Sequence, residues 1–234
     1  MTLCCDYKSA DRPQLGAGLL EADKLVFNSR PGFKPKIVSF TLKARDCIWI
    51  RGASGEGKTT LLRTIARLIV PARGRMLLEG VPWEEFPAAE WRCRVIYLHQ
   101  KAVLFPGKVR TNLERAFSFR SRTSDRLDIE RARTELLSFL LPDDILERDS
   151  LTLSVGEASR VALVRALMVN PEVLLLDEVT AALDTRSRDA VVSRLREWVA
   201  SGTRGLVWVA HDDALLKLMP GTEISLDDLE RDSD

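Results

Sequence analysis

The apolar residues of the chain fall into two patterns that alternate from about residue 20 to residue 219. Short apolar or alternating runs indicate strands, whereas apolar residues that recur every three or four positions indicate helices. The short runs predict strands at residues 20–27, 37–42, 47–50, 75–80, 95–98, 173–176 and 206–210. The longer patterns predict helices at residues 58–69, 88–94, 109–146 (broken at 121–124 and 141–144), 157–169, 186–200 and 214–219. This order predicts an α/β fold with a helical insertion.

The two ends of the chain show neither pattern. Residues 1–18 contain prolines and glycines without periodicity, and we interpret them as a flexible N-terminal leader. Residues 221–234 are rich in acidic side chains, and we expect them to form a solvated C-terminal tail. The residues between them, 19–220, are expected to form a single domain. The expected boundaries inside this domain are 19–100 and 155–220 for the core and about 101–154 for the helical insertion.

Composition narrows the class of protein. The chain carries 35 Lys and Arg against 34 Asp and Glu, so its net charge is +1, whereas a general nucleic-acid binder usually has a basic excess. Its apolar runs are shorter than a membrane-spanning helix, and the first residues do not resemble a signal peptide. Cys4, Cys5, Cys47 and Cys93 lack the spacing of metal ligands. We therefore expect a soluble cytoplasmic protein that does not bind nucleic acid.

The segment that follows the strand at 47–50 matches the pattern G-x-x-x-x-G-K-S/T and leads into a helix. Its glycines let backbone N–H groups point inward toward anionic oxygens, and the helix that begins at Lys58 adds the positive end of its dipole. Lys58 can reach the β- and γ-phosphates of a nucleotide, and the Thr59 hydroxyl can ligate Mg²⁺. The expected nucleotide-binding residues are Gly52, Ala53, Ser54, Gly55, Glu56, Gly57, Lys58, Thr59 and Thr60.

Two acidic residues follow the uniformly apolar run at 173–176. Such a run is typical of a central parallel strand, and ligand sites in open α/β sheets lie at the carboxyl ends of such strands. Asp177 is suited to hold Mg²⁺ through a water molecule, and Glu178 can polarise the water that attacks the γ-phosphate. The alternative is that both acids only cap a strand–helix turn, but the phosphate loop elsewhere in the chain favours catalysis.

A second helix start also has the chemistry to bind an anion. Ser154 and Glu157 have the S-x-x-E spacing of a capping box, which is a purely structural interpretation. Ser154 and Gly156 also offer a hydroxyl group and an exposed N–H to an anion at the start of a helix. One chain would then carry two phosphate-binding helix starts that are distant in the sequence.

These motifs together resemble the nucleotide-binding subunit of an ABC transporter from about Leu20 to about Pro220. The signature of that family reads L-S-G-G-Q, and this chain departs from it at Val155 and Glu157 while it retains Ser154 and Gly156. The resemblance implies a P-loop NTPase with a RecA-like core, an antiparallel β-subdomain and an inserted α-helical subdomain. It also implies a head-to-tail homodimer, in which Ser154 and Gly156 complete the ATP site of the other subunit.

The resemblance assigns roles to three further residues. Gln100 matches the glutamine loop, which senses Mg²⁺ and the attacking water and couples to the membrane subunit. Asp184, in the run Ala182-Leu183-Asp184, matches the loop that crosses the dimer interface, and His211 matches the switch histidine that contacts the γ-phosphate. The implied catalytic residues are Glu178, His211, Lys58 and Gln100, and the implied metal ligands are Thr59, Gln100 and Asp177.

Recognition of the base departs from the family pattern. The family stacks adenine on an aromatic residue upstream of the phosphate loop, and the best alignment places Ser29 there. Phe27 or Phe33 are the candidate substitutes. The five tryptophan residues lie in predicted elements, and we expect them to be packing residues instead.

The function that the resemblance implies is ATP hydrolysis, with ATP and Mg²⁺, that drives transport through a separate integral membrane permease. The subunit would lie at the cytoplasmic face of the inner membrane and would dock near Gln100 and residues 105–109. Residues 105–113, 141–146 and 206–212 are similar to the ATPase subunits of a small bacterial group linked to iron export.

Two alternatives belong to other classes of protein. The first is a soluble ABC-type ATPase that acts in DNA repair or on the ribosome. The repair type splits its halves with a long coiled coil, whereas no sustained heptads lie between Gln100 and Ser154, and the ribosomal type carries two cassettes where one is seen here. The second is a P-loop kinase, which leaves Ser154 and His211 unexplained.

Overall fold

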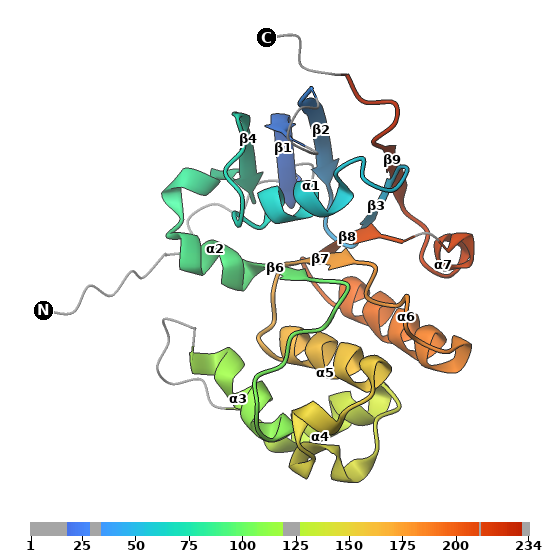
Figure 1. The fold of residues 1–234 in the computed structure, drawn as a ribbon. Coiled ribbons are helices and arrows are strands. Elements are labelled where there is room, and N and C mark those ends of the chain that lie inside the picture. The colour runs from blue at the N-terminus through green and yellow to red at the C-terminus, as the bar shows by residue number, and fades with distance from the viewer. Residues whose placement is uncertain (1–17, 29–33, 119–126, 211, 231–234) are drawn as a thin grey trace, which may run out of the picture.

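The computed structural model describes residues 18–28, 34–118, 127–210 and 212–230, which form two sheets and a set of helices (Figure 1). The strands are β1 (Leu20–Phe27), β2 (Lys36–Leu42), β3 (Cys47–Arg51), β4 (Arg73–Leu78), β5 (Val81–Pro82), β6 (Val95–Leu98), β7 (Val173–Asp177), β8 (Gly205–Val209) and β9 (Thr222–Ser225). The helices are α1 (Lys58–Ile65), α2 (Ala88–Arg94), α3 (Val109–Ser118), α4 (Ile129–Ser138), α5 (Val155–Met168), α6 (Thr185–Ala200) and α7 (Asp213–Leu218). Short 3₁₀ turns are η1 (Trp83–Glu85), η2 (Asp143–Glu147) and η3 (Ser150–Thr152).

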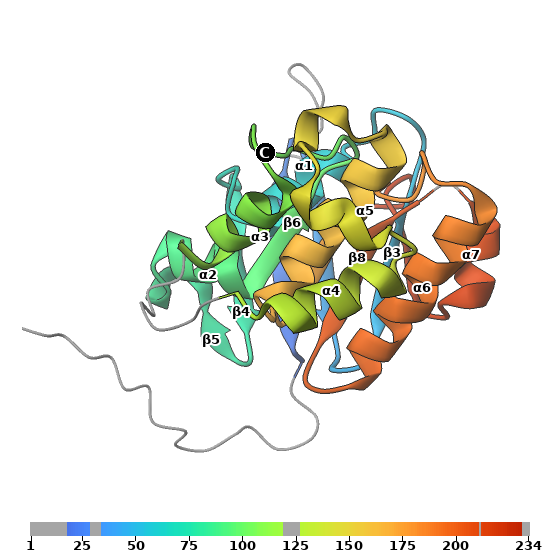
Figure 2. The same cartoon turned by 90° about the horizontal axis from the view of Figure 1, so that it is seen from below.

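One sheet is antiparallel and the other is parallel. The antiparallel sheet has the strand order β2-β1-β4-β5, and the parallel sheet has the order β6-β7-β8-β3-β9. Helix α1 contacts both β1 and the parallel strands β6, β7 and β8, so it is packed between the two sheets. Figures 1 and 2 show α5 and α6 on the opposite face of the parallel sheet, with α3 and α4 beyond α5. The expected α/β core with an antiparallel sheet and a helical insertion is therefore confirmed.

Strand β7 is buried along its whole length because layers cover both of its faces. Leu174 and Leu176 belong to the apolar cluster that contains α5 and α6. Val173 and Leu175 belong to the cluster that contains α1 and the antiparallel sheet. Side chains alternate between the two faces of a strand, so an uninterrupted apolar run is what a doubly covered strand requires.

Two of the tryptophan residues strengthen the pairing of β3 with β8. Trp49 and Trp208 are register partners in the two parallel strands, and their rings stack with centroids 4.9 Å apart. The Trp49 indole N–H donates to the carbonyl oxygen of Met219 at 3.0 Å. All five tryptophans are buried, as predicted for packing residues.

The helix that follows the phosphate loop is shorter than its periodicity predicts. Leu68 and Ile69 continue the apolar spacing, but α1 ends at Ile65 and Leu68 is exposed. Arg67 adopts a left-handed φ of 55°, its N–H bonds to Thr64 O, and the N–H of Leu68 bonds to Arg63 O. These two bonds form a Schellman motif, which usually has glycine at the left-handed position. Arg67 occupies that position here, so the sequence lacked the usual stop signal.

The expected boundary at residue 221 is wrong, because the chain returns to the sheet there. Strand β9 pairs in parallel with β3, which makes it an edge strand of the parallel sheet. Leu226 is fully buried, and its N–H donates to Arg51 O at 2.9 Å. Further along, the carbonyl oxygen of Glu230 accepts from the N–H of Ile37. Residues 222–230, which we call the C-terminal segment, therefore belong to the domain.

This arrangement predicts that the C-terminal segment contributes to global stability. Leu226→Ala should lower the free energy of unfolding by about 2–5 kcal/mol, because it removes buried apolar contacts and leaves a cavity. Urea denaturation followed by tryptophan fluorescence measures the change. Val70→Ala is the matched control, since Val70 is 90% exposed. A Leu226→Ala variant as stable as this control would show that the segment is not part of the core.

Candidate functional site

The phosphate loop, residues Gly52 to Thr60, joins the end of β3 to the start of α1 (Figure 1). Gly57 is the N-cap of α1 with a φ of 97°, a left-handed conformation that glycine adopts without steric cost. The Lys58 ammonium donates to Gly52 O at 2.6 Å and to Ala53 O at 2.9 Å, so it lies across the loop. Ala53, Ser54 and Gly55 are exposed. The loop therefore exposes backbone to solvent around a buried cation.

Asp177 is a buried carboxylate at the end of β7, 3% exposed. It accepts hydrogen bonds at Oδ2 from the Thr59 hydroxyl at 2.9 Å and from the Tyr97 hydroxyl at 2.8 Å. A hydroxyl group has one proton and two lone pairs, so Thr59 can donate to Asp177 and still ligate a cation. One hydroxyl and one carboxylate suit Mg²⁺, which keeps several waters and is completed by substrate phosphates.

Tyr97 is a member of this site that the sequence did not reveal. Burial and its hydrogen bond to Asp177 raise the pKa of Tyr97 far above its usual value, so it remains a proton donor. Tyr97 lies in β6, and its register partner in β7 is Leu175, two residues before Asp177. No motif signals this role, because the contact depends on strand pairing across some 80 residues of chain.

Glu178 and Gln100 meet at the carboxyl ends of neighbouring strands. The Gln100 amide Nε2 donates to Glu178 Oε2 at 2.9 Å. Glu178 has a left-handed φ of 51°, and its N–H donates to Val209 O at 3.0 Å. A non-glycine residue in this conformation costs of order 1–3 kcal/mol, and such strain is concentrated at functional sites. Two of the residues predicted to be catalytic are thus in contact.

The signature segment forms the capping box that its spacing predicts. The N–H of Glu157 donates to Ser154 Oγ, and Glu157 Oε2 accepts from the N–H of Ser154. Glu157 also pairs with Arg148 at 2.8 Å. In the described part of the chain, the side-chain hydrogen bonds that involve Ser154, Gly156 and Glu157 run to residues 148–160. Ser154 is exposed, and its hydroxyl proton is not used by the cap.

The loop before α6 lies against this signature helix. A Cβ on Gly156 would lie 3.4 Å from Leu183 Cδ2 and 3.5 Å from Ala182 O. Asp184 follows as the N-cap of α6 and accepts from the N–H of Ser187 at 3.0 Å. The hydrogen bonds from Ser187 lower the pKa of Asp184. The predicted interface loop and the signature motif are therefore neighbours within one chain.

The structure brings together some of the predicted site residues but not all of them. Lys58 and Thr59, with Asp177, Glu178 and Gln100, gather at the carboxyl edge of the parallel sheet. Ser154, Gly156 and Asp184 form a separate group at the starts of α5 and α6, in which Ser154 and Asp184 are exposed and Gly156 is half-buried. His211 lies outside the described residues and stays a prediction. The candidate base-stacking residues Ser29 and Phe33 also lie outside them. The suggestion that Phe27 stacks on adenine is wrong, because Phe27 is 2% exposed and packs inside the apolar core.

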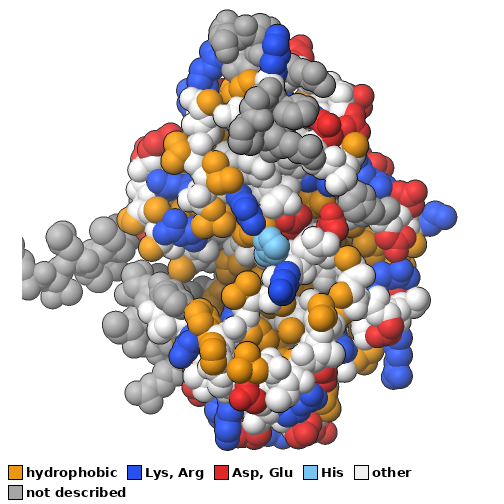
Figure 3. Space-filling model, in the orientation of Figure 1, with side chains coloured by type: hydrophobic (Ala, Val, Ile, Leu, Met, Phe, Trp, Pro, Cys, Tyr) orange, Lys and Arg blue, Asp and Glu red, His pale blue; other side chains and the backbone are white. Residues whose placement is uncertain are grey.

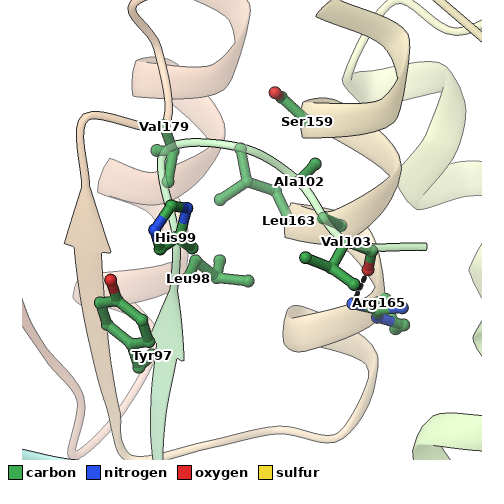
Figure 4. A pocket seen from close by; sticks show the side chains of 10 residues that line it. Tyr97, Leu98, His99, Ala102, Val103, Ser159, Leu163, Arg165 and Val179 are labelled. Carbon is green, nitrogen blue, oxygen red and sulfur yellow. Dashed lines mark hydrogen bonds between the residues drawn. The ribbon is translucent and has the colours of Figure 1, made fainter. Parts of the chain in front are cut away.

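A cavity of about 150 Å³ lies beside the glutamine loop, between the end of β6 and helix α5 (Figure 4). The Arg165 guanidinium crosses one end and donates to Val103 O at 2.8 Å. Its other terminal nitrogen, Nη1, is buried without a hydrogen-bond partner in the described chain. The cavity is mostly apolar, and its lining residues are Tyr97, Leu98, His99, Ala102, Val103, Ser159, Ala162, Leu163, Arg165 and Val179.

Comparison with known proteins agrees with this geometry. Residues 35–181 match the family described as "ABC transporter". The chain is 35% identical over 198 residues to the probable iron export ATP-binding protein FetA of Escherichia coli, covering 83% of this chain and 82% of that protein. It is 39% identical over 166 residues to the molybdate/tungstate import ATP-binding protein WtpC of Methanocaldococcus jannaschii, covering 70% of this chain. That match spans only 54% of WtpC.

Two solved structures share the fold. A bacterial Atm1-family ABC exporter with ATP bound superposes with a TM-score of 0.73 at 25% identity, over 89% of this chain and 37% of that one. The cbiO1 protein of Clostridium perfringens, part of the ABC transporter complex cbiONQ, superposes with a TM-score of 0.69 at 22% identity, over 84% of this chain and 79% of that one. The family match and the similarity to FetA show that this chain belongs to the ATP-binding subunits of the ABC transporter family.

Proposed function

We propose that this chain hydrolyses ATP in a head-to-tail homodimer and thereby drives transport through a separate membrane permease. The observation that carries the proposal is the contact between Gln100 and Glu178 beside the Thr59–Asp177 pair. One edge of the sheet thus brings together groups that can bind phosphate, groups that can ligate a metal ion, and a candidate catalytic base. The relatives named above are transport proteins, which favours this function over a soluble ATPase of DNA repair or the ribosome.

Nucleotide binding uses the phosphate loop. Backbone N–H groups of the phosphate loop and of the start of α1 would bind the phosphates, and Lys58 would exchange its loop carbonyl contacts for phosphate oxygens. Thr59 and Asp177 would hold Mg²⁺ with Gln100 nearby, and that ion would neutralise charge on the β- and γ-phosphates. Tyr97 keeps the Asp177 carboxylate oriented through its hydrogen bond.

Hydrolysis requires a water molecule aligned with the γ-phosphate. Glu178 accepts a proton from this water while the water oxygen attacks the γ-phosphorus. The bond between that phosphorus and the bridging oxygen breaks, and the oxygen leaves with ADP. Gln100 holds the Glu178 carboxylate through its amide N–H. His211 is proposed to contact the γ-phosphate, in keeping with its place after strand β8 in the sequence.

The exposed signature group supports the shared site. At the start of α5, Ser154 offers its hydroxyl proton and Gly156 its backbone N–H, which suits an anion at a helix N-terminus. Their hydrogen bonds run to residues 148–160 rather than to the phosphate loop of the same chain. A second subunit in head-to-tail orientation would place these groups over its partner's nucleotide, with Asp184 at the interface.

The proposed docking surface for the permease lies beside Gln100 and includes the cavity and residues 105–109. The guanidinium groups of Arg115 and Arg165 both contact the Phe105 ring, at 4.7 Å and 5.8 Å from its centroid. Asn112 fixes the Phe105 backbone by accepting from its N–H and donating to its carbonyl oxygen. Figure 3 shows hydrophobic side chains interspersed with Lys and Arg on the face that it presents. A movement of this surface would reach Glu178 through Gln100.

Iron is the proposed cargo, and export the proposed direction, because the similarity to FetA covers most of both chains. Within the described residues, no helix is both long and apolar enough to cross a bilayer. We propose a peripheral location at the cytoplasmic face of the inner membrane, where a permease supplies the transmembrane path.

The catalytic role of Glu178 predicts the effect of one substitution. Glu178→Gln should lower the rate of ATP hydrolysis about 100-fold or more and leave ATP binding intact, because the amide retains the shape but cannot accept the proton. Closed dimers should accumulate with ATP, as measured by light scattering. The matched control is Glu114→Gln at an exposed position on α3. Turnover that matches the control would remove Glu178 as the base.

The shared site predicts a different result for Ser154. Ser154→Arg should preserve nucleotide binding by the isolated subunit but abolish the rise of specific activity with protein concentration, because the long side chain blocks the partner's nucleotide. Ser193→Arg, at an exposed position on α6, is the control. Hydrolysis and fluorescent-nucleotide binding are measured across a concentration series. A strictly monomeric preparation with full activity would contradict the dimer.

A further inference from the structure

The phosphate loop contains an acid at a position that is unfavourable for its function. Glu56 lies between Gly55 and Gly57, within the loop that is proposed to bind the phosphates. Its N–H bonds back to Ala53 O at 3.3 Å, so the residue is part of the loop's own turn. A carboxylate there repels the phosphate groups, and this repulsion is strong in a partly buried site of low effective dielectric.

Lys36 on strand β2 supplies the opposite charge. Its ammonium forms an ion pair with Glu56 Oε2 and donates to Leu226 O at 2.6 Å. Lys36 is only 4% exposed, which is rare for lysine and requires such partners. The Glu56 side chain is 31% exposed in this pair. The cation is therefore held inside the protein, and the acid reaches it from the loop.

The C-terminal segment fixes this ion pair in place. Leu226 bonds to Arg51 O through its N–H and to Lys36 through its carbonyl oxygen, and the N–H of Ala53 donates to Asp227 Oδ1 at 3.3 Å. Lys36 thus connects β2, the phosphate loop and the C-terminal segment at one point. An exposed ion pair between flexible side chains would contribute little, whereas one held from three sides keeps its geometry.

We propose that Lys36 is a positioning residue that neutralises Glu56 and so allows the loop to bind the β- and γ-phosphates. This inference rests on the proposed binding of ATP. Without Lys36, the phosphate loop loses the positive charge that offsets Glu56, so the negative phosphates meet a less favourable potential there. The loss of nucleotide affinity depends on how much phosphate charge enters the loop. The affinities for ATP and ADP therefore fall far more than the affinity for AMP.

Lys36→Met tests the proposal, because methionine keeps most of the side-chain length and loses the charge. ATP affinity should fall about tenfold, the size expected for one unit charge at roughly 10 Å in an effective dielectric of about 20. ADP affinity should fall similarly, and AMP affinity less than about twofold. Competition against a fluorescent ATP analogue gives all three values on the full chain. Lys43→Met, an exposed lysine just after β2, is the control.

The double variant Lys36→Met/Glu56→Gln separates electrostatics from folding. It should recover most of the ATP affinity, because no carboxylate remains to be neutralised. Equal losses for ATP, ADP and AMP, or no recovery in the double variant, would overturn the proposal in favour of a purely structural lysine. Thermal unfolding of each variant reports that structural contribution directly.

Glu56→Gln alone provides an independent measurement that does not depend on whether Lys36→Met folds. The ammonium of Lys36 then faces the loop without its counter-charge, so ATP should bind more tightly and AMP should be nearly unchanged. Unchanged or weaker ATP binding would overturn the proposal. Failure of the wild-type chain to bind ATP would instead refute the proposed function, so the two failures are distinguishable.

Discussion

Burial of β7 on both faces is the constraint on which the rest of the site depends. Leu174 and Leu176 pack toward α5 and α6 while Val173 and Leu175 pack toward α1, so the strand cannot shift by one residue without exchanging its two sets of contacts. The register places Asp177 at a fixed, buried position. A buried carboxylate needs hydrogen-bond donors, and Thr59 on α1 is one of them. The packing of the core thereby connects the phosphate-loop helix to the acidic edge of the sheet.

The parts of this arrangement that could be predicted from the sequence are those that local pattern encodes. The apolar run before Asp177, the glycine spacing of the phosphate loop and the Ser154–Glu157 capping box all depend on residues close together in the chain. The roles of Tyr97 and Lys36 could not be predicted, because each depends on strands that meet only in the folded protein.

The predicted end of helix α1 and the predicted C-terminal boundary of the domain are both wrong, for related physical reasons. Helix α1 ends because Arg67 adopts a left-handed conformation, and the sequence lacks the glycine that usually marks such a helix end. Strand β9 is short and carries Glu223, so its composition resembles a solvated tail. Its place in the sheet comes from pairing with β3 and from the burial of Leu226, which are both non-local.

The two departures from the family signature are compatible with a working helix start. Val155 is 63% exposed, so it fills no core position and leaves the cap undisturbed. Partial burial acts to raise the pKa of Glu157, but the hydrogen bonds from Ser154 and the pairing with Arg148 hold it below its usual value. The carboxylate therefore stays ionised at neutral pH and keeps the Ser154 N–H satisfied, with Arg148 offsetting its charge. The hydroxyl proton of Ser154 remains available for an external anion.

The phosphate loop is held by elements from three distant parts of the chain. Asp177 contacts it from β7, Lys36 from β2, and Leu226 and Asp227 from the C-terminal segment. Gly52, with a φ of 145°, approaches Leu226 so closely that an added Cβ would lie 3.2 Å from Leu226 Cβ, so the first glycine of the motif also serves this packing. A loop ordered before the nucleotide arrives loses little conformational entropy on binding, so more of the interaction with the phosphates appears as affinity. The buried Lys36 and the C-terminal segment therefore both affect ATP binding through the phosphate loop, although neither belongs to the sequence motif of that loop.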